Sequence, residues 1–172
     1  MPPSKITPVS RDQALPLSFS QKRFWFLNTL EPESTALNMS SAYRIEGALD
    51  RDALTQSLSA LMRRHEALRT RLRETDKEPE QVIDPTTDVP LPLTVRAKES
   101  IDGDEDLRRQ LTALAQRPFD LARGPVVRFG LYQLGTNEHV LQIAAHHTVT
   151  DGWSMGIFLR ELATCYEAFS TN

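Results

Sequence analysis

Two adjacent histidines, followed at a short interval by an aspartate and a glycine, are the residues of this chain best suited to chemistry. They lie in the segment His146-His147-Thr148-Val149-Thr150-Asp151-Gly152. A neutral imidazole can accept a proton from a nucleophile at pH 7, so a histidine here could act as a base. The same pattern is also typical of a buried, hydrogen-bonded core histidine beside an aspartate in a turn.

Strand alternation distinguishes the two histidines. Side chains at successive positions of a strand point to opposite faces. One face would carry Leu141, Ile143, Ala145 and His147, and the other Val140, Gln142, Ala144 and His146. Because His147 shares its face with three apolar residues, we expect it to line a water-poor pocket and to be the catalytic candidate.

The elements around this segment would hold it between a strand and a helix. Apolar residues alternate from His139 to Ala145, which predicts a strand. We expect a turn at Asp151-Gly152 and a helix that begins near Ser154, a residue type favoured at the N-cap. The helix is predicted by apolar residues at helical spacing, namely Met155, Phe158, Leu159, Leu162, Tyr166 and Phe169. A side chain at the strand end would then face the free amides of a helix N-terminus.

Metal binding is a further alternative, since the two histidines and Asp151 supply three possible ligands. The two imidazoles diverge from opposite strand faces, and His139 and His65 have no motif spacing to them. No metal site is therefore predicted. The single cysteine, Cys165, lies in the last predicted helix and is expected to be a small core residue.

Length and composition indicate one globular domain. The chain has 172 residues, of which 40% are hydrophobic and 25% charged. Its net charge of −3 argues against a general nucleic-acid-binding protein. One cysteine excludes an intramolecular disulfide and fits a reducing compartment. No apolar run reaches the length of a membrane span, and no signal peptide is apparent, so we expect a cytoplasmic location without a membrane partner.

The remaining patterns alternate between strands and helices, which predicts an α/β layered sandwich. Residues 1–16 contain several prolines and are expected to be a linker that leads into a domain over residues 17–172. Ser18 to Gln21 has the pattern of a capping box, and the aromatic residues after it are expected to lie in the core. The predicted elements are a helix through Leu30, a strand over 41–49, a helix capped by Asp50, a hairpin over 69–83 with its tip at 76–79, a loop over 84–92, a strand over 91–97, a helix from Asp102 to before Pro118, and a hairpin over 126–147.

The helix after Asp50 has the clearest amphipathic pattern. Its apolar stripe consists of Leu54, Leu58, Leu61, His65 and Leu68. A histidine on such a stripe is expected to be a hydrogen-bonded core residue and not a catalyst.

Three segments resemble core motifs of one family, the condensation domains of non-ribosomal peptide synthetases. Residues 18–27 (SFSQKRFWFL) resemble the first motif, residues 64–70 (RHEALRT) the second, and residues 146–154 (HHTVTDGWS) the third, whose active-site pattern is HHxxxDG. The resemblance is specific because all three occur in the family's order and at similar separations. Trp153-Ser154 is similar to the peptide-condensing subfamilies, whereas heterocyclising relatives have aspartate in place of the histidines.

The resemblance implies a fold and a reaction. Condensation domains consist of two lobes, each similar to chloramphenicol acetyltransferase, and this sequence resembles the N-terminal lobe, because the later core motifs are missing. The implied fold is a two-layer α/β sandwich with a mixed or antiparallel sheet. The implied reaction forms an amide between a peptidyl thioester on an upstream carrier protein and an aminoacyl thioester on a downstream one. Phosphopantetheine arms carry both substrates, and no cofactor is bound directly.

The resemblance also implies partners and alternatives. The expected partners are the two carrier proteins, the C-terminal lobe and an adjacent adenylation domain. Without the second lobe the isolated chain is expected to be inactive. One alternative is an oligomeric CoA-dependent acyltransferase, since such enzymes share HxxxDG. The other is a non-catalytic lobe that only docks partners.

Residue roles follow from the matching positions. His147, the second histidine, would orient or deprotonate the attacking amine, and His146 would be structural. Gly152 would leave room for the thioester and offer its amide to the developing oxyanion. Asp151 would form a buried ion pair with an arginine, for which Arg64 is one candidate and a residue of the missing lobe is the alternative.

Two residues after the motif are expected to contact substrate. Trp153 and Ser154 would line the substrate tunnel between the lobes. Trp153 and Met155 are expected to lie on an apolar surface that is exposed in this chain alone.

Overall fold

A four-stranded mixed sheet is the centre of the fold. The structure, a computed structural model, describes residues 7–11, 13–76, 78–85 and 91–171. The strand order is β2-β7-β6-β5. β2 (Asn38–Glu46), β7 (Glu138–His146) and β6 (Val127–Gly135) are antiparallel neighbours, and β5 (Leu93–Arg96) runs parallel to β6. The strand that carries the histidines, β7, is therefore paired on both edges.

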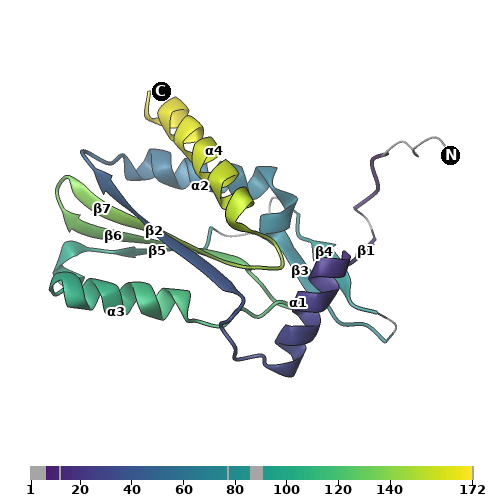
Figure 1. Cartoon of the computed structure of the whole chain (residues 1–172). Coiled ribbons are helices and arrows are strands. Elements are labelled where there is room, and N and C mark those ends of the chain that lie inside the picture. The colour runs from purple at the N-terminus through teal and green to yellow at the C-terminus, as the bar shows by residue number, and fades with distance from the viewer. Residues whose placement is uncertain (1–6, 12, 77, 86–90, 172) are drawn as a thin grey trace.

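Helices cover both faces of this sheet (Figure 1). α2 (Arg51–Arg64) and α4 (Gly152–Ser170) pack on one face, and α3 (Gly103–Ala115) lies on the other. Strand alternation sorts the side chains of β7 as predicted: Ile143 joins the core under α2 and α4, whereas Gln142 donates to the Leu111 carbonyl of α3. The predicted α/β sandwich with a mixed sheet is confirmed, and α3 adds a helical layer on the second face.

The main core fills the space between the sheet and the two helices α2 and α4. It includes Leu54, Leu58 and Leu61 of α2, Phe129 and Leu131 of β6, Leu141, Ile143 and Ala145 of β7, and Met155, Phe158 and Leu162 of α4. The helical and strand periodicities of the sequence therefore meet in one apolar layer, which anchors the start of α4 next to the end of β7.

A smaller sheet holds the N-terminal part of the chain. Its order is β1-β4-β3, with β1 at Leu15–Pro16, β4 at Glu80–Ile83 and β3 at Thr70–Arg73. α1 (Phe19–Leu30) follows β1 and lies beside this sheet (Figure 1). The predicted capping box is present, since Gln21 N donates to Ser18 Oγ and Ser18 N donates to Gln21 Oε1.

Several predicted boundaries are wrong by a few residues. The helix capped by Asp50 ends at Arg64 and not at Leu68, because His65 adopts an extended conformation (φ −97°, ψ 101°) and the 3₁₀ helix η1 (Glu66–Arg69) follows. The strand predicted over 41–49 spans Asn38–Glu46, and that over 91–97 is shortened to Leu93–Arg96 before the 3₁₀ helix η2 (Lys98–Ser100). The predicted hairpin tip includes Lys77, and the predicted loop over 84–92 includes residues 86–90; both lie outside the described residues.

Part of the predicted lead-in belongs to the folded structure. Leu15 and Pro16 pair with β4, and Arg11 forms an ion pair with Glu66 at 2.8 Å. The division into residues 1–16 and 17–172 stays a prediction. Within the described residues, the structure has no helix with the length and apolar character to cross a membrane.

Candidate active site

His147 lies directly after the end of β7, where the chain turns towards α4. Its backbone N–H donates to the Leu37 carbonyl at 2.9 Å. Leu37 directly precedes β2, so this hydrogen bond extends the pairing of β7 with β2 by one residue. Its ring Nδ1 lies 2.8 Å from the Thr150 carbonyl oxygen. A carbonyl oxygen can only accept, so Nδ1 carries a proton, and in the neutral ring Nε2 keeps its lone pair. His147 is therefore held in the tautomer that can accept a proton at Nε2.

The ring of His147 is stacked on Phe24 of α1. The ring centroids lie 4.7 Å apart, and the ring planes differ by 19°. Both side chains are half-buried. The first and third sequence motifs therefore meet at this histidine.

His146 is the drier of the two histidines, contrary to the prediction. Its side chain is 1% exposed, and its Nδ1 accepts a hydrogen bond from Thr148 N at 3.2 Å. Burial lowers the pKa of His146 to about 4, with a smaller effect of the charge of His147. His147 lies beyond the end of β7 and stacks on Phe24, whereas Phe119 packs edge-on against His146. His146 is neutral at pH 7 and has the environment of a structural residue.

Asp151 is the N-cap of α4, in place of the predicted Ser154. Its Oδ1 accepts from Ser154 N at 2.7 Å and from Ser154 Oγ at 2.6 Å. These hydrogen bonds from Ser154 lower the pKa of Asp151, so the carboxylate is ionised at neutral pH. The aspartate occupies the cap position because α4 begins at Gly152, and Ser154 lies within the first turn, where its N–H needs an acceptor.

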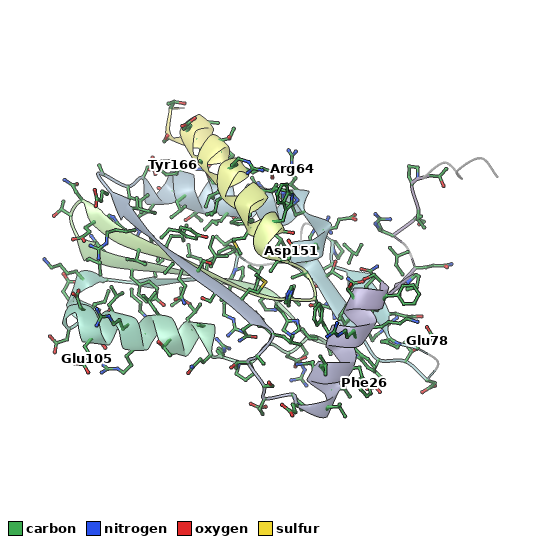
Figure 2. The ribbon with its side chains drawn as sticks, in the orientation of Figure 1. Phe26, Arg64, Glu78, Glu105, Asp151 and Tyr166 are labelled. Atoms are coloured by element: carbon green, nitrogen blue, oxygen red, sulfur yellow. The ribbon has the colours of Figure 1, made fainter. Side chains whose placement is uncertain are left out.

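Arg64 is not the partner of Asp151 in this chain. Asp151 is exposed, and Arg64 Nε lies 3.5 Å from Glu161 Oε2. His65 Nε2 lies 2.5 Å from the same oxygen, so the end of α2 is joined to the middle of α4. The hydrogen bond with His65 lowers the pKa of Glu161. Figure 2 shows Arg64 and Asp151 near the first half of α4.

His65 differs from the fully packed core histidine that was expected. Its side chain is about one-third exposed (33%), although it is hydrogen-bonded. The stripe is interrupted because α2 ends one residue before His65.

The residues at the start of α4 differ strongly in exposure. Trp153 is 80% exposed, as predicted, whereas Met155 is 8% exposed and belongs to the main core, which corrects the expectation for that residue. Gly152 begins the helix on an open side, since a Cβ at this position would have nothing within 4 Å. There is consequently free space beside the Gly152 backbone.

A small apolar cavity is lined in part by Val149 and Thr150. Its volume is about 210 Å³, and its lining includes Ile143, Ala145, Thr150 and Ile157. It is smaller than the roughly 300–1,000 Å³ that drug-sized ligands occupy. The described residues contain no group of three or more His, Cys, Asp or Glu side chains that could hold a metal ion.

Sequence reasoning missed the partner of the catalytic candidate. The aromatic residues of α1 were expected to lie in the core, but α1 has no buried residue, and Phe19 is 96% exposed. The contact of Phe24 with His147 joins distant segments, so no local pattern reports it.

The comparisons with known proteins agree with this geometry. The model of the family "Condensation domain" matches residues 11–172. The chain is 44% identical over 167 residues to one of the linear gramicidin synthase proteins of Brevibacillus parabrevis, a match that covers 96% of this chain and 2% of that protein. It is 43% identical over 167 residues to malpinin synthetase of Mortierella alpina, covering 95% of this chain and 2% of that protein. The chain therefore spans only a small part of the length of these relatives.

Solved structures show the same fold. The complex of the X-domain and OxyB from teicoplanin biosynthesis matches with a TM-score of 0.85 and 33% identity, over 96% of this chain and 35% of that one. The first condensation domain of the calcium-dependent antibiotic synthetase, in complex with a substrate analogue, matches with a TM-score of 0.83 and 23% identity, over 93% of this chain and 40% of that one. The family match over residues 11–172, on a fold that places the HHxxxDG segment between β7 and α4, shows that this chain belongs to the condensation-domain family.

Proposed function

We propose that this chain forms the histidine-bearing N-terminal lobe of a condensation domain that makes peptide bonds within a non-ribosomal peptide synthetase. The observation that carries the proposal is the 2.8 Å contact between His147 Nδ1 and the Thr150 carbonyl oxygen. His147 Nδ1 donates to this carbonyl, which leaves Nε2 of the neutral ring free to accept a proton beside the N-terminus of α4.

The reaction joins two carrier-bound substrates. The amine of the downstream aminoacyl group attacks the carbonyl carbon of the upstream thioester, so that a C–N bond forms and the C–S bond breaks. The nitrogen loses one proton, which His147 Nε2 accepts and returns to the departing thiolate of the phosphopantetheine arm. Proton and electron balance therefore close without a redox partner.

The residues around His147 would support this step. The amide of Gly152, at the exposed start of α4, would donate to the oxyanion of the tetrahedral intermediate, since the first amides of a helix have no intrahelical acceptor. Asp151 would hold this turn in place as the N-cap, and His146 would anchor the end of β7. Trp153 and Ser154 would line the tunnel along which the arms reach His147. Arg64 would act at a distance from substrate, through its pair with Glu161.

The partners follow from the reaction. They are an upstream and a downstream carrier protein, a second lobe that closes the tunnel opposite His147, and an adjacent adenylation domain that loads the downstream carrier. The structure of a four-domain nonribosomal peptide synthetase bound to AMP and glycine matches this chain with 26% identity and a TM-score of 0.80, over 90% of this chain and 12% of that one, which supports such a context.

The test is a condensation assay on this chain joined to the remainder of its domain. Two carrier proteins, one loaded with an acylated aminoacyl group and one with an aminoacyl group, are mixed with the protein, and the dipeptidyl product on the downstream carrier is followed by mass spectrometry. We expect product with the wild type and none with the chain that ends at Asn172. If CoA thioesters are accepted in place of the upstream carrier at an equal kcat/KM, the synthetase function is contradicted.

A further inference from the structure

Phe24 makes a contact that a purely structural role does not explain. It lies on α1, a helix with no buried residue, and its ring covers one face of His147 at a centroid distance of 4.7 Å. Phe24 itself is half-buried, so the contact adds little to the apolar core. The stack therefore affects the His147 ring more than it stabilises α1.

Few other contacts determine where α1 lies. Gln21 Nε2 donates to Gln81 Oε1 at 3.4 Å, Lys22 pairs with Glu78 at 2.5 Å, and Trp25 packs on the cluster around Leu121 and Ala144. These contacts set the position of the helix, and with it the position at which the ring of Phe24 meets His147.

The histidine ring needs such a contact to be fixed. The torsion between Cβ and the ring is broad for histidine, and the bond from Nδ1 to the Thr150 carbonyl is a single point about which the ring can still tilt. A nearly parallel aromatic ring restrains that tilt, because offset-stacked rings are favoured over other arrangements. Together the bond and the stack determine the direction in which the Nε2 lone pair points.

We propose that Phe24 is a positioning residue for His147. It holds the imidazole plane so that Nε2 points at the amine of the acceptor substrate, and it excludes water from one face of the ring. The proposal rests on the proposed function, since only a proton-accepting histidine needs this orientation. It also assigns the first sequence motif a task at the reaction centre, although the motif lies far from the histidines in the chain.

The first test needs no turnover. In the chain itself, nuclear magnetic resonance of the His147 ring reports the Nδ1–H tautomer through its nitrogen shifts and the stack through ring-current shifts of its carbon-bound protons. We expect Phe24→Leu to remove the ring-current shift and to mix the two tautomers, and Phe24→Tyr to preserve both signals. The control is Val9→Ala, since Val9 is 61% exposed and lies before β1, outside α1, and this change is not expected to alter the His147 signals.

The second test uses the complete condensation domain. We expect Phe24→Leu to lower kcat by roughly 10- to 100-fold, the scale of orientation effects, with less than a twofold change in KM, and Phe24→Tyr to restore kcat. An unchanged tautomer ratio of His147 in Phe24→Leu, or an equal loss of kcat in Val9→Ala, would overturn the positioning role. A wild-type domain that forms no peptide bond would instead contradict the proposed function, and the resonance experiment would still decide the role of Phe24. If Phe24→Leu does not fold, Phe24→Met serves in both tests.

Discussion

At the scale of single residues, two neighbouring histidines at the end of β7 differ strongly in exposure. His146 is the last residue of β7 and is 1% exposed, whereas His147 is half-buried and bonded to the turn that follows. The alternation in the sequence predicts different environments for the two side chains, and their exposure does differ. It could not show which face is drier, because that depends on Phe119, which arrives from a distant loop.

This difference predicts separable effects of mutation. In the complete domain, His147→Ala should lower the rate of condensation by about 10²–10⁴-fold, the usual contribution of a positioned base, with a small change in melting temperature. His146→Gln should mainly destabilise the fold, by about 1–3 kcal/mol, because Thr148 N loses its buried acceptor. Condensation rates and thermal melts of both variants check the assignment. A stable His146→Gln protein with the larger catalytic loss would reverse the roles.

His146 also predicts a pH dependence of stability. Its pKa is about 4 in the folded chain, against about 6.5 in the unfolded chain. Between these values the unfolded chain binds a proton that the folded chain does not, so the contribution is complete above pH 6.5 and is lost as the pH falls towards 4. The free energy of unfolding should decrease by up to about 3 kcal/mol over this window.

Urea unfolding at pH 7 and at pH 4.5 measures this decrease. The carboxylates of Glu66, Asp106 and Glu161, whose pKa values are lowered by their hydrogen-bond partners, contribute in the same direction. They are present in both proteins, so the comparison of wild type with His146→Gln isolates the histidine. An equal pH dependence in the two proteins would contradict the assignment.

At the scale of elements, local signals in the sequence predicted the starts of helices better than their ends. Asp50 caps α2 as expected, since its Oδ1 accepts from Asp52 N and Ala53 N. The end of α2 at Arg64 could not be seen locally, because the apolar stripe continues to Leu68 through a 3₁₀ turn. The sequence predicted Ser154 as the cap of α4, whereas the cap is Asp151. The two could not be distinguished locally, because aspartate and serine are both good caps and lie in the same turn.

The corrected cap changes what Asp151 variants should do. As an exposed N-cap, Asp151 can be replaced by asparagine with little loss, because asparagine caps about as well as aspartate. Asp151→Ala removes the acceptor for Ser154 N and should lower the melting temperature by a few degrees. Differential scanning calorimetry distinguishes this from a buried ion pair, in which Asp151→Asn would be the strongly destabilised variant.

At the scale of the whole molecule, the sequence motifs predicted the family, and the periodicities predicted most elements of the mixed sheet and its helices. The position of α1 could not be predicted, because the first motif has the composition of a core helix and yet has no buried residue. Its exposed apolar side chains and Trp153 lie on the two elements that flank His147. A surface of this kind is expected where a second lobe and carrier-bound substrates would contact the chain.

This surface leads to a prediction for the chain alone. Phe19, Phe26 and Leu30 of α1 are 96%, 55% and 63% exposed, and Trp153 is 80% exposed. Because exposed apolar surface favours association in water, we expect the sedimentation coefficient of the isolated chain to rise with concentration. The double variant Phe26→Ser with Trp153→Ser should weaken this association. The matched control is Val9→Ser, since Val9 is 61% exposed but lies before β1. A chain that stays monomeric at all concentrations, or that associates equally strongly in the double variant and the control, would show that this surface is not an unpaired interface.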